Sequence, residues 1–147
     1  MGRTIITIGL VHLFIGVVSC MATPAVPALK NVFKDHFLIG GALNRWVVAG
    51  RNTGAVEIAV KHFNTATAEN AMKWLSLNPW PGRYNWEAAD DFVAFCEKNE
   101  MVAIGHCLVW HSQVPRWLFR DDAGNALTRD TLLTRMKNHI MAVAGRY

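Results

Sequence analysis

VAIGHCLVWHSQVPRW, residues 102–117, is the stretch that decides the fold of this 147-residue chain. It begins as an unbroken apolar run with a bias towards β-branched residues, which is typical of a strand buried on both faces of a parallel sheet. Val114-Pro115 prevents simple continuation of a central strand, so the segment must leave the sheet. In parallel α/β folds, ligands bind where the strands emerge at their carboxyl ends. We therefore expect a pocket wall formed by His106, Trp110, His111 and Gln113.

The same aromatic and imidazole side chains could instead be satisfied core residues, and this stretch alone leaves both interpretations open. In an extended strand, alternation places His106 and Trp110 on one face and His111 on the other. The two histidines cannot then bind the same metal ion. We expect neither a metal site nor a cofactor from this motif.

Two strands are predicted upstream of this stretch. FLIGGAL, residues 37–43, is consistent with a first buried strand, and FNTAT, residues 63–67, with a short second one. Asn52 or Thr53 can cap a helix between them. Its apolar residues recur at i, i+3, i+4 and i+7, and they are Val56, Ala59, Val60 and Phe63.

Two further helices complete a β-α-β-α-β-α order. Asn85 can cap a helix that ends near Asn99, and Thr128 can cap the last helix of the chain. Their apolar stripes consist of Ala89, Phe92, Val93 and Cys96 in the first, and Leu133, Met136, Ile140 and Val143 in the second. This order predicts a parallel sheet with crossover helices. Eight such units close a barrel in about 250 residues, whereas three leave both outer strands unpaired, so the sequence looks unfinished.

The composition excludes intrinsic disorder, because 52% of the residues are hydrophobic and only 18% are charged. The net charge is +4, but lysines and arginines are scattered along the chain and no nucleic-acid-binding motif is present. Nucleic acid is therefore not an expected partner. Cys96 and Cys107 form no disulfide framework or CxxC pair, so buried free thiols are expected.

Two long motifs at strand ends, FNTATAENAMKW (residues 63–74) and GHCLVWHSQVPRW (residues 105–117), stand between FLIGGAL and a helix ending in MKNHIMAVAGRY. In kind, order and spacing they resemble glycoside hydrolase family 10, the (β/α)8 endo-1,4-β-xylanases. The resemblance covers about residues 29–147. It implies an α/β fold comprising the first three βα units of a (β/α)8 TIM barrel, and xylan or a xylo-oligosaccharide as the partner.

The resemblance also implies a sugar-binding face. Glu69, Asn70 and Lys73 match the groups that hydrogen-bond the glycone sugars in the family, and His106, Trp110 and Gln113 match contacts around the cleavage subsite. Such groups suit a pyranose, which offers vicinal hydroxyls and apolar C–H faces that stack on tryptophan. The alternative for Glu69 and Lys73 is a surface i, i+4 pair on a helix. Cys107 stands where many relatives have threonine.

The chain differs from the family pattern in its catalytic acidic residues. Retaining glycosidases need two carboxyl groups roughly 5 Å apart. In the family these are glutamates near the ends of the fourth and seventh strands, which would follow Tyr147, so no catalytic residue is expected in this chain. We expect it to be inactive and unstable without the missing C-terminal part of the barrel. The alternative is a non-catalytic xylan-binding surface lipoprotein.

The N-terminus predicts export, because Arg3 precedes an apolar run that is too short for an ordinary membrane span. VVSC, residues 17–20, resembles a lipoprotein processing site that would leave Cys20 lipidated. Ordinary cleavage within residues 22–28 is the alternative. The protein would be secreted, or anchored at the periplasm or cell surface through a lipid on Cys20. The expected division is a signal peptide at 1–19, a tether at 20–30 and the N-terminal part of the catalytic barrel at 31–147.

Overall fold

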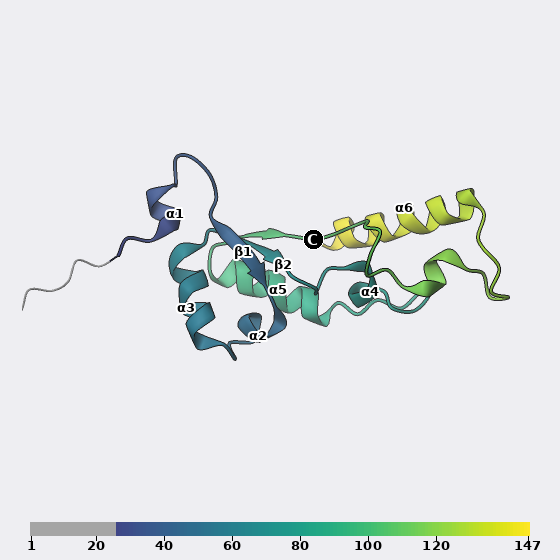
Figure 1. Ribbon diagram of the computed structural model, residues 1–147, viewed down its shortest axis with the longest axis horizontal. Coiled ribbons are helices and arrows are strands. Elements are labelled where there is room, and N and C mark those ends of the chain that lie inside the picture. Colours follow the sequence, from purple (N-terminus) through teal and green to yellow (C-terminus); the bar gives the residue numbers. More distant parts are fainter. Residues whose placement is uncertain (1–25) are drawn as a thin grey trace, which may run out of the picture.

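Three short parallel strands form the centre of the computed structural model, which describes residues 26–147 (Figure 1). They are β1 (Gly40–Leu43), β2 (Thr65–Ala68) and β3 (Val102–Ile104), paired in that order. The longer helices are α3 (Thr53–His62), α5 (Glu87–Lys98) and α6 (Arg129–Arg146), and the short ones are α1 (Leu29–Val32), α2 (Arg45–Val48), α4 (Trp74–Leu77) and the 3-10 helix η1 (Arg116–Phe119). The predicted β-α-β-α-β-α order and the parallel sheet are confirmed.

The predicted signal peptide and Cys20 lie outside the described residues. Near the end of the predicted tether, Leu29 and Lys30 already belong to α1. The Leu29 N–H donates to Nδ1 of His62 at 3.2 Å, and the Lys30 ammonium donates to the Val60 carbonyl at 2.8 Å. These residues are therefore docked on α3. Within residues 26–147, no helix is both long and apolar enough to cross a membrane.

The first two strands are shorter than, or displaced from, their predicted ranges. β1 covers only the last four residues of 37–43, and β2 lies at Thr65–Ala68 rather than 63–67. The side-chain oxygen of Asn64 accepts a hydrogen bond from the Ile39 N–H at 2.7 Å, so regular main-chain pairing between the two strands begins only after these residues. Gly40 then faces Thr65, where an added Cβ would lie 2.3 Å from the Thr65 carbonyl oxygen. The two strands approach so closely there that only glycine fits.

The expectation of a third strand buried on both faces is wrong. β3 has three residues, of which Val102 and Ile104 are 53% and 45% exposed. Within the described chain β3 pairs only with β2, so its other edge has no neighbour. An edge strand buries less of each side chain than a central strand does.

Helix starts follow their predicted caps in two of three cases. The side chain of Asn52 accepts from the Ala55 N–H at 3.2 Å, and that of Thr128 accepts from the Thr131 N–H at 3.3 Å. Asn85 does not cap α5, whose N-cap is Trp86. The Asn85 N–H instead donates to Leu77 at 2.7 Å, which holds this residue in the preceding loop.

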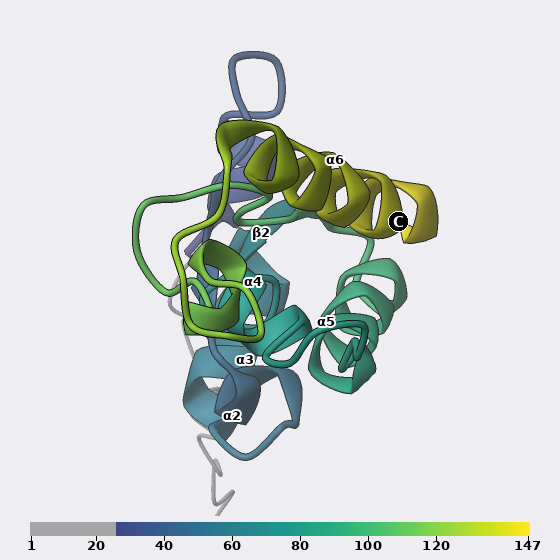
Figure 2. The ribbon, with the colours of Figure 1, turned by 90° about the vertical axis from the view of Figure 1, so that its right-hand side faces the viewer.

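The core lies between the sheet and its helices. Its buried members include Leu43, Ala66, Leu77, Phe92, Cys96 and Val143. Cys96 is a buried free thiol as predicted, whereas Cys107 is only partly buried. Figures 1 and 2 show the C-terminal end of α6 close to α5, where the Arg146 guanidinium donates to both oxygens of Asp90 at 2.9 and 2.6 Å. This ion pair joins the last helix to the one before it.

Candidate functional site

The candidate site lies where the three parallel strands end. Asn44 follows β1, Glu69 follows β2, and Gly105 follows β3, so all three exits lie at the same edge of the sheet. The Glu69 N–H donates to the Leu43 carbonyl at 3.1 Å and ties the first two exits together. The chain after β2 is therefore held against the end of β1.

Lys73 is the centre of this site. Its residue is only 8% exposed, and its ammonium donates to Oδ1 of Asn70 at 2.8 Å. The same ammonium lies 5.3 Å from the centroid of the Trp110 ring. Among the described residues, no carboxylate lies within 4.0 Å of it. An ammonium has three N–H donors, and Asn70 takes only one of them here, so this group can also bind a polar ligand.

Trp110 lies between two histidines. Its ring centroid is 5.7 Å from that of His106 and 5.3 Å from that of His111. Strand alternation, which would place His111 on the opposite face, does not apply here, because the chain leaves the strand after Ile104. The aromatic face and both imidazoles thus belong to one loop.

Of the six predicted site residues, four are linked by contacts: Asn70, Lys73, Trp110 and His106. Glu69 and Gln113 are exposed at the same edge, and the structure records no side-chain contact from either to these four. Gln113 has a positive φ of 51°, and its carbonyl accepts from the Leu75 N–H at 3.0 Å. The alternative of a surface helical pair fails, because Lys73 is buried and the helix α4 begins only after it.

Sequence reasoning missed the role of Asn78, which is 3% exposed and holds the loops of the site together. Its amide donates to the carbonyls of Trp80 and Arg83 at 2.8 and 2.9 Å. Its side-chain oxygen accepts from Nε1 of Trp74 at 3.4 Å, and its main-chain oxygen accepts from Nε1 of Trp117 at 3.2 Å.

A buried histidine of α6 was also missed. The ring of His139 is 1% exposed and stacks on that of Trp74 at 3.9 Å. Its Nδ1 lies 3.4 Å from the Tyr84 hydroxyl, and its Nε2 has no partner among the described residues. Burial lowers the pKa of His139 to about 4. Its position three residues after Met136 and four before Val143 was the available signal, because this spacing places it on the apolar stripe.

Within residues 26–147, no three His, Cys, Asp or Glu side chains gather closely enough to hold a metal ion. The site offers ammonium, amide, imidazole and indole groups at the end of a parallel sheet. This set can hydrogen-bond hydroxyl groups and stack against an apolar ring face.

Comparison with known proteins identifies what this arrangement is similar to. The family model for "Glycosyl hydrolase family 10" matches residues 28–147. Endo-1,4-beta-xylanase A of Xylanibacter ruminicola is 41% identical over 121 residues, which cover 82% of this chain and 33% of that protein.

Solved structures agree. The endo-1,4-beta-xylanase of Caldicellulosiruptor owensensis superposes with a TM-score of 0.76 at 41% identity, covering 83% of this chain and 36% of its own. The intracellular xylanase of Thermoanaerobacterium saccharolyticum, crystallised as a mutant in complex with xylotriose, superposes with a TM-score of 0.78 at 38% identity. This match covers 84% of the present chain and 39% of that xylanase. The chain thus spans roughly a third of the length of these relatives, and the predicted fold class, the first units of a TIM barrel, is confirmed.

Proposed function

The chain belongs to glycosyl hydrolase family 10, and on that premise we propose that it serves as the N-terminal part of a retaining endo-1,4-β-xylanase barrel. In this role it supplies sugar contacts, and the catalytic glutamates belong to barrel units outside these 147 residues. The observation that carries the proposal is the Lys73 ammonium, which joins the Asn70 amide to the Trp110 ring without a carboxylate partner among the described residues.

The chemistry of the cluster suits a xylose unit. Lys73 uses one N–H on Asn70 and keeps two for sugar hydroxyls. Trp110 offers an aromatic face for the C–H face of the ring, and His106 lies beside it. Glu69 and Gln113, at the rim of the same edge, complete the proposed set of substrate contacts.

We do not propose that this chain hydrolyses xylan by itself. Retention requires an acid/base and a nucleophile, and Glu69 is the one carboxylate in the proposed set. Binding groups such as Asn70 and His106 cannot replace the missing covalent step.

We further propose export, with the leader at residues 1–19 removed and Cys20 as the point of lipid attachment in the lipoprotein variant. Mass spectrometry of the mature N-terminus tests this. A diacylglyceryl group on Cys20 supports anchoring, and an unmodified start within residues 22–28 supports secretion. A native protein that retains Met1 contradicts both.

Binding is tested by calorimetric titration of the chain with xylotriose in a sucrose buffer, because excluded osmolytes favour the compact state. We expect Asn70→Ala to weaken binding by about tenfold, which corresponds to the loss of one hydrogen bond to sugar or lysine. Asn138→Ala, on the exposed side of α6, is the matched control and should bind like the parent chain. Equal affinities for the two variants would contradict the proposed site.

Activity is tested by reducing-sugar release from xylan. The chain should release none, and activity should appear when the remaining barrel units are restored by fusion or as a complementary fragment. Hydrolysis by the chain alone that disappears in Glu69→Gln would overturn this part of the proposal and identify Glu69 as a catalyst. Binding without activity in the restored barrel would instead favour the non-catalytic xylan-binding lipoprotein.

A further inference from the structure

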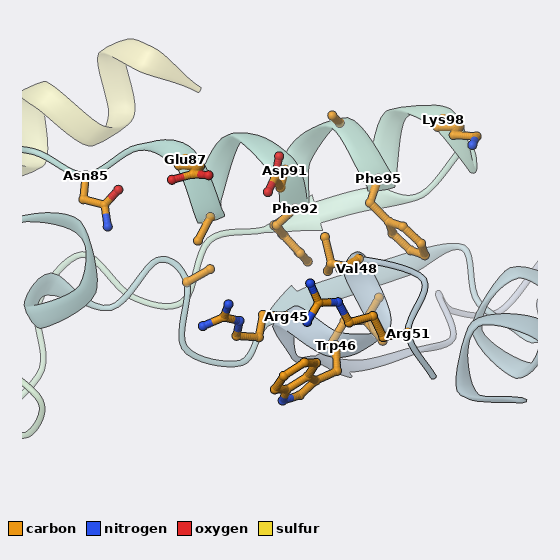
Figure 3. A pocket seen from close by; sticks show the side chains of 15 residues that line it. Arg45, Trp46, Val48, Arg51, Asn85, Glu87, Asp91, Phe92, Phe95 and Lys98 are labelled. Carbon is orange, nitrogen blue, oxygen red and sulfur yellow. The ribbon is translucent and has the colours of Figure 1, made fainter. Parts of the chain in front are cut away.

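A cavity of about 680 Å³ lies between α2 and α5 (Figure 3). Ala71 forms part of its wall and directly follows Asn70 in the chain. Leu43, the last residue of β1, lines it as well. The cavity is therefore adjacent to the site at the carboxyl edge of the sheet, and all of its walls belong to described residues.

The α2 side of this cavity carries two arginines around one tryptophan. Trp46 is 51% exposed, and the guanidinium carbons of Arg45 and Arg51 lie 5.4 and 5.0 Å from its ring centroid. Within residues 26–147, no carboxylate lies within 4.0 Å of either guanidinium. Two cations thus gather around one exposed aromatic ring, and neither has an anionic partner in the described part of the chain.

The α5 side differs in character. Figure 3 shows Phe92 and Phe95 extending from α5 towards α2, while Glu87 and Asp91 lie along α5, away from the two guanidinium groups. The acids of the cavity therefore do not neutralise the arginines. An anionic group on the α2 side would meet two guanidinium groups first.

We propose that this cavity binds a carboxylate-bearing sugar substituent, a hexuronic acid unit, on the same polysaccharide that Asn70 and Lys73 contact. Guanidinium groups donate paired hydrogen bonds that match the two oxygens of a carboxylate. The Trp46 ring holds both guanidinium groups by cation–π contact, which keeps them together as a pair of donors for one carboxylate. The inference rests on the proposed xylan-binding function and adds a preference for acidic decoration.

The test compares the affinity of the chain for glucuronoxylan with that for the same polymer after reduction of its carboxyl groups. Both are measured by affinity electrophoresis in sucrose buffer. We expect the carboxylate form to bind about tenfold more tightly, and the Arg45→Gln/Arg51→Gln double variant to bind both forms equally. Both arginines are exposed, so the variant should fold, which its circular dichroism spectrum checks.

The control is the Arg116→Gln/Arg129→Gln double variant, which makes the same change of net charge at exposed residues outside the cavity. It should keep the tenfold preference. Loss of the preference in this control, an equal affinity of the parent chain for both polymers, or equally tight binding of polygalacturonate would overturn the inference. Xylotriose titration separates the two proposals: absent xylotriose binding refutes the proposed function, whereas normal xylotriose binding without the preference refutes only the uronate site.

Discussion

Acidification should destabilise this protein through His139, whose ring is buried against Trp74. Burial lowers its pKa from 6.5 to about 4 in the folded chain. Between these two values the unfolded chain binds a proton that the folded chain does not, so the free energy of unfolding falls as the pH decreases. The difference in pKa corresponds to about 3 kcal/mol, which is lost progressively between pH 6.5 and pH 4.

The assay is urea unfolding of the chain in sucrose buffer, followed by circular dichroism from pH 7 to pH 4. His139→Phe keeps an aromatic ring on Trp74 but cannot titrate, so it should lose far less stability over this range than the parent chain. His36→Asn, at an exposed position, is the matched control and should follow the parent chain.

Asp90 acts outside this window. The Arg146 guanidinium and the Tyr147 hydroxyl hold the pKa of Asp90 below its usual value of 3.8, so the stability that this carboxylate contributes is lost only at still lower pH. Parallel pH dependences for the parent chain and His139→Phe between pH 6.5 and pH 4 would refute the reasoning.

Three substitutions test packing and capping, each by the urea midpoint at pH 7. Asn78→Ala should cost about 1 to 3 kcal/mol, because it removes the two hydrogen bonds from the Asn78 amide to the carbonyls of Trp80 and Arg83; a cost below that of a surface alanine substitution would contradict this role. Gly40→Ala should cost about 1 to 3 kcal/mol, since the new Cβ would lie 2.3 Å from the Thr65 carbonyl oxygen. The control is Gly54→Ala in α3, where the added Cβ would have no atom within 4 Å, so this substitution should be neutral or stabilising. Thr128→Ala should cost about 1 kcal/mol through loss of the α6 cap, and unchanged stability would refute that cap.

The sequence by itself determined the local elements and their order. Asn52 and Thr128 cap their helices as predicted, because a side chain that bonds to an N–H three residues later acts within one turn. The alternation of strand and helix predicted a parallel sheet, and the strand exits at Glu69 and His106 then had to lie at one edge.

Strand extent and burial depended on neighbours that local patterns do not specify. The apolar run from Val102 predicted a buried central strand, but β3 pairs on one side only in the described chain and ends at Ile104. Asn85 has the chemistry of a cap, yet its main chain is held by Leu77, so the helix begins after Trp86. Both errors arise because the main-chain partners that a segment has or lacks in the folded chain override its local preference.

Only the tertiary structure brought together the groups that carry the two proposals. Lys73 meets Trp110 across 37 positions of sequence, and His139 reaches Trp74 from the last helix. The cavity beside Arg51 has walls from two helices that are separated along the chain by β2. Contacts of this kind depend on how helices pack on the sheet, and the spacing of residues along one segment contains no information about that packing.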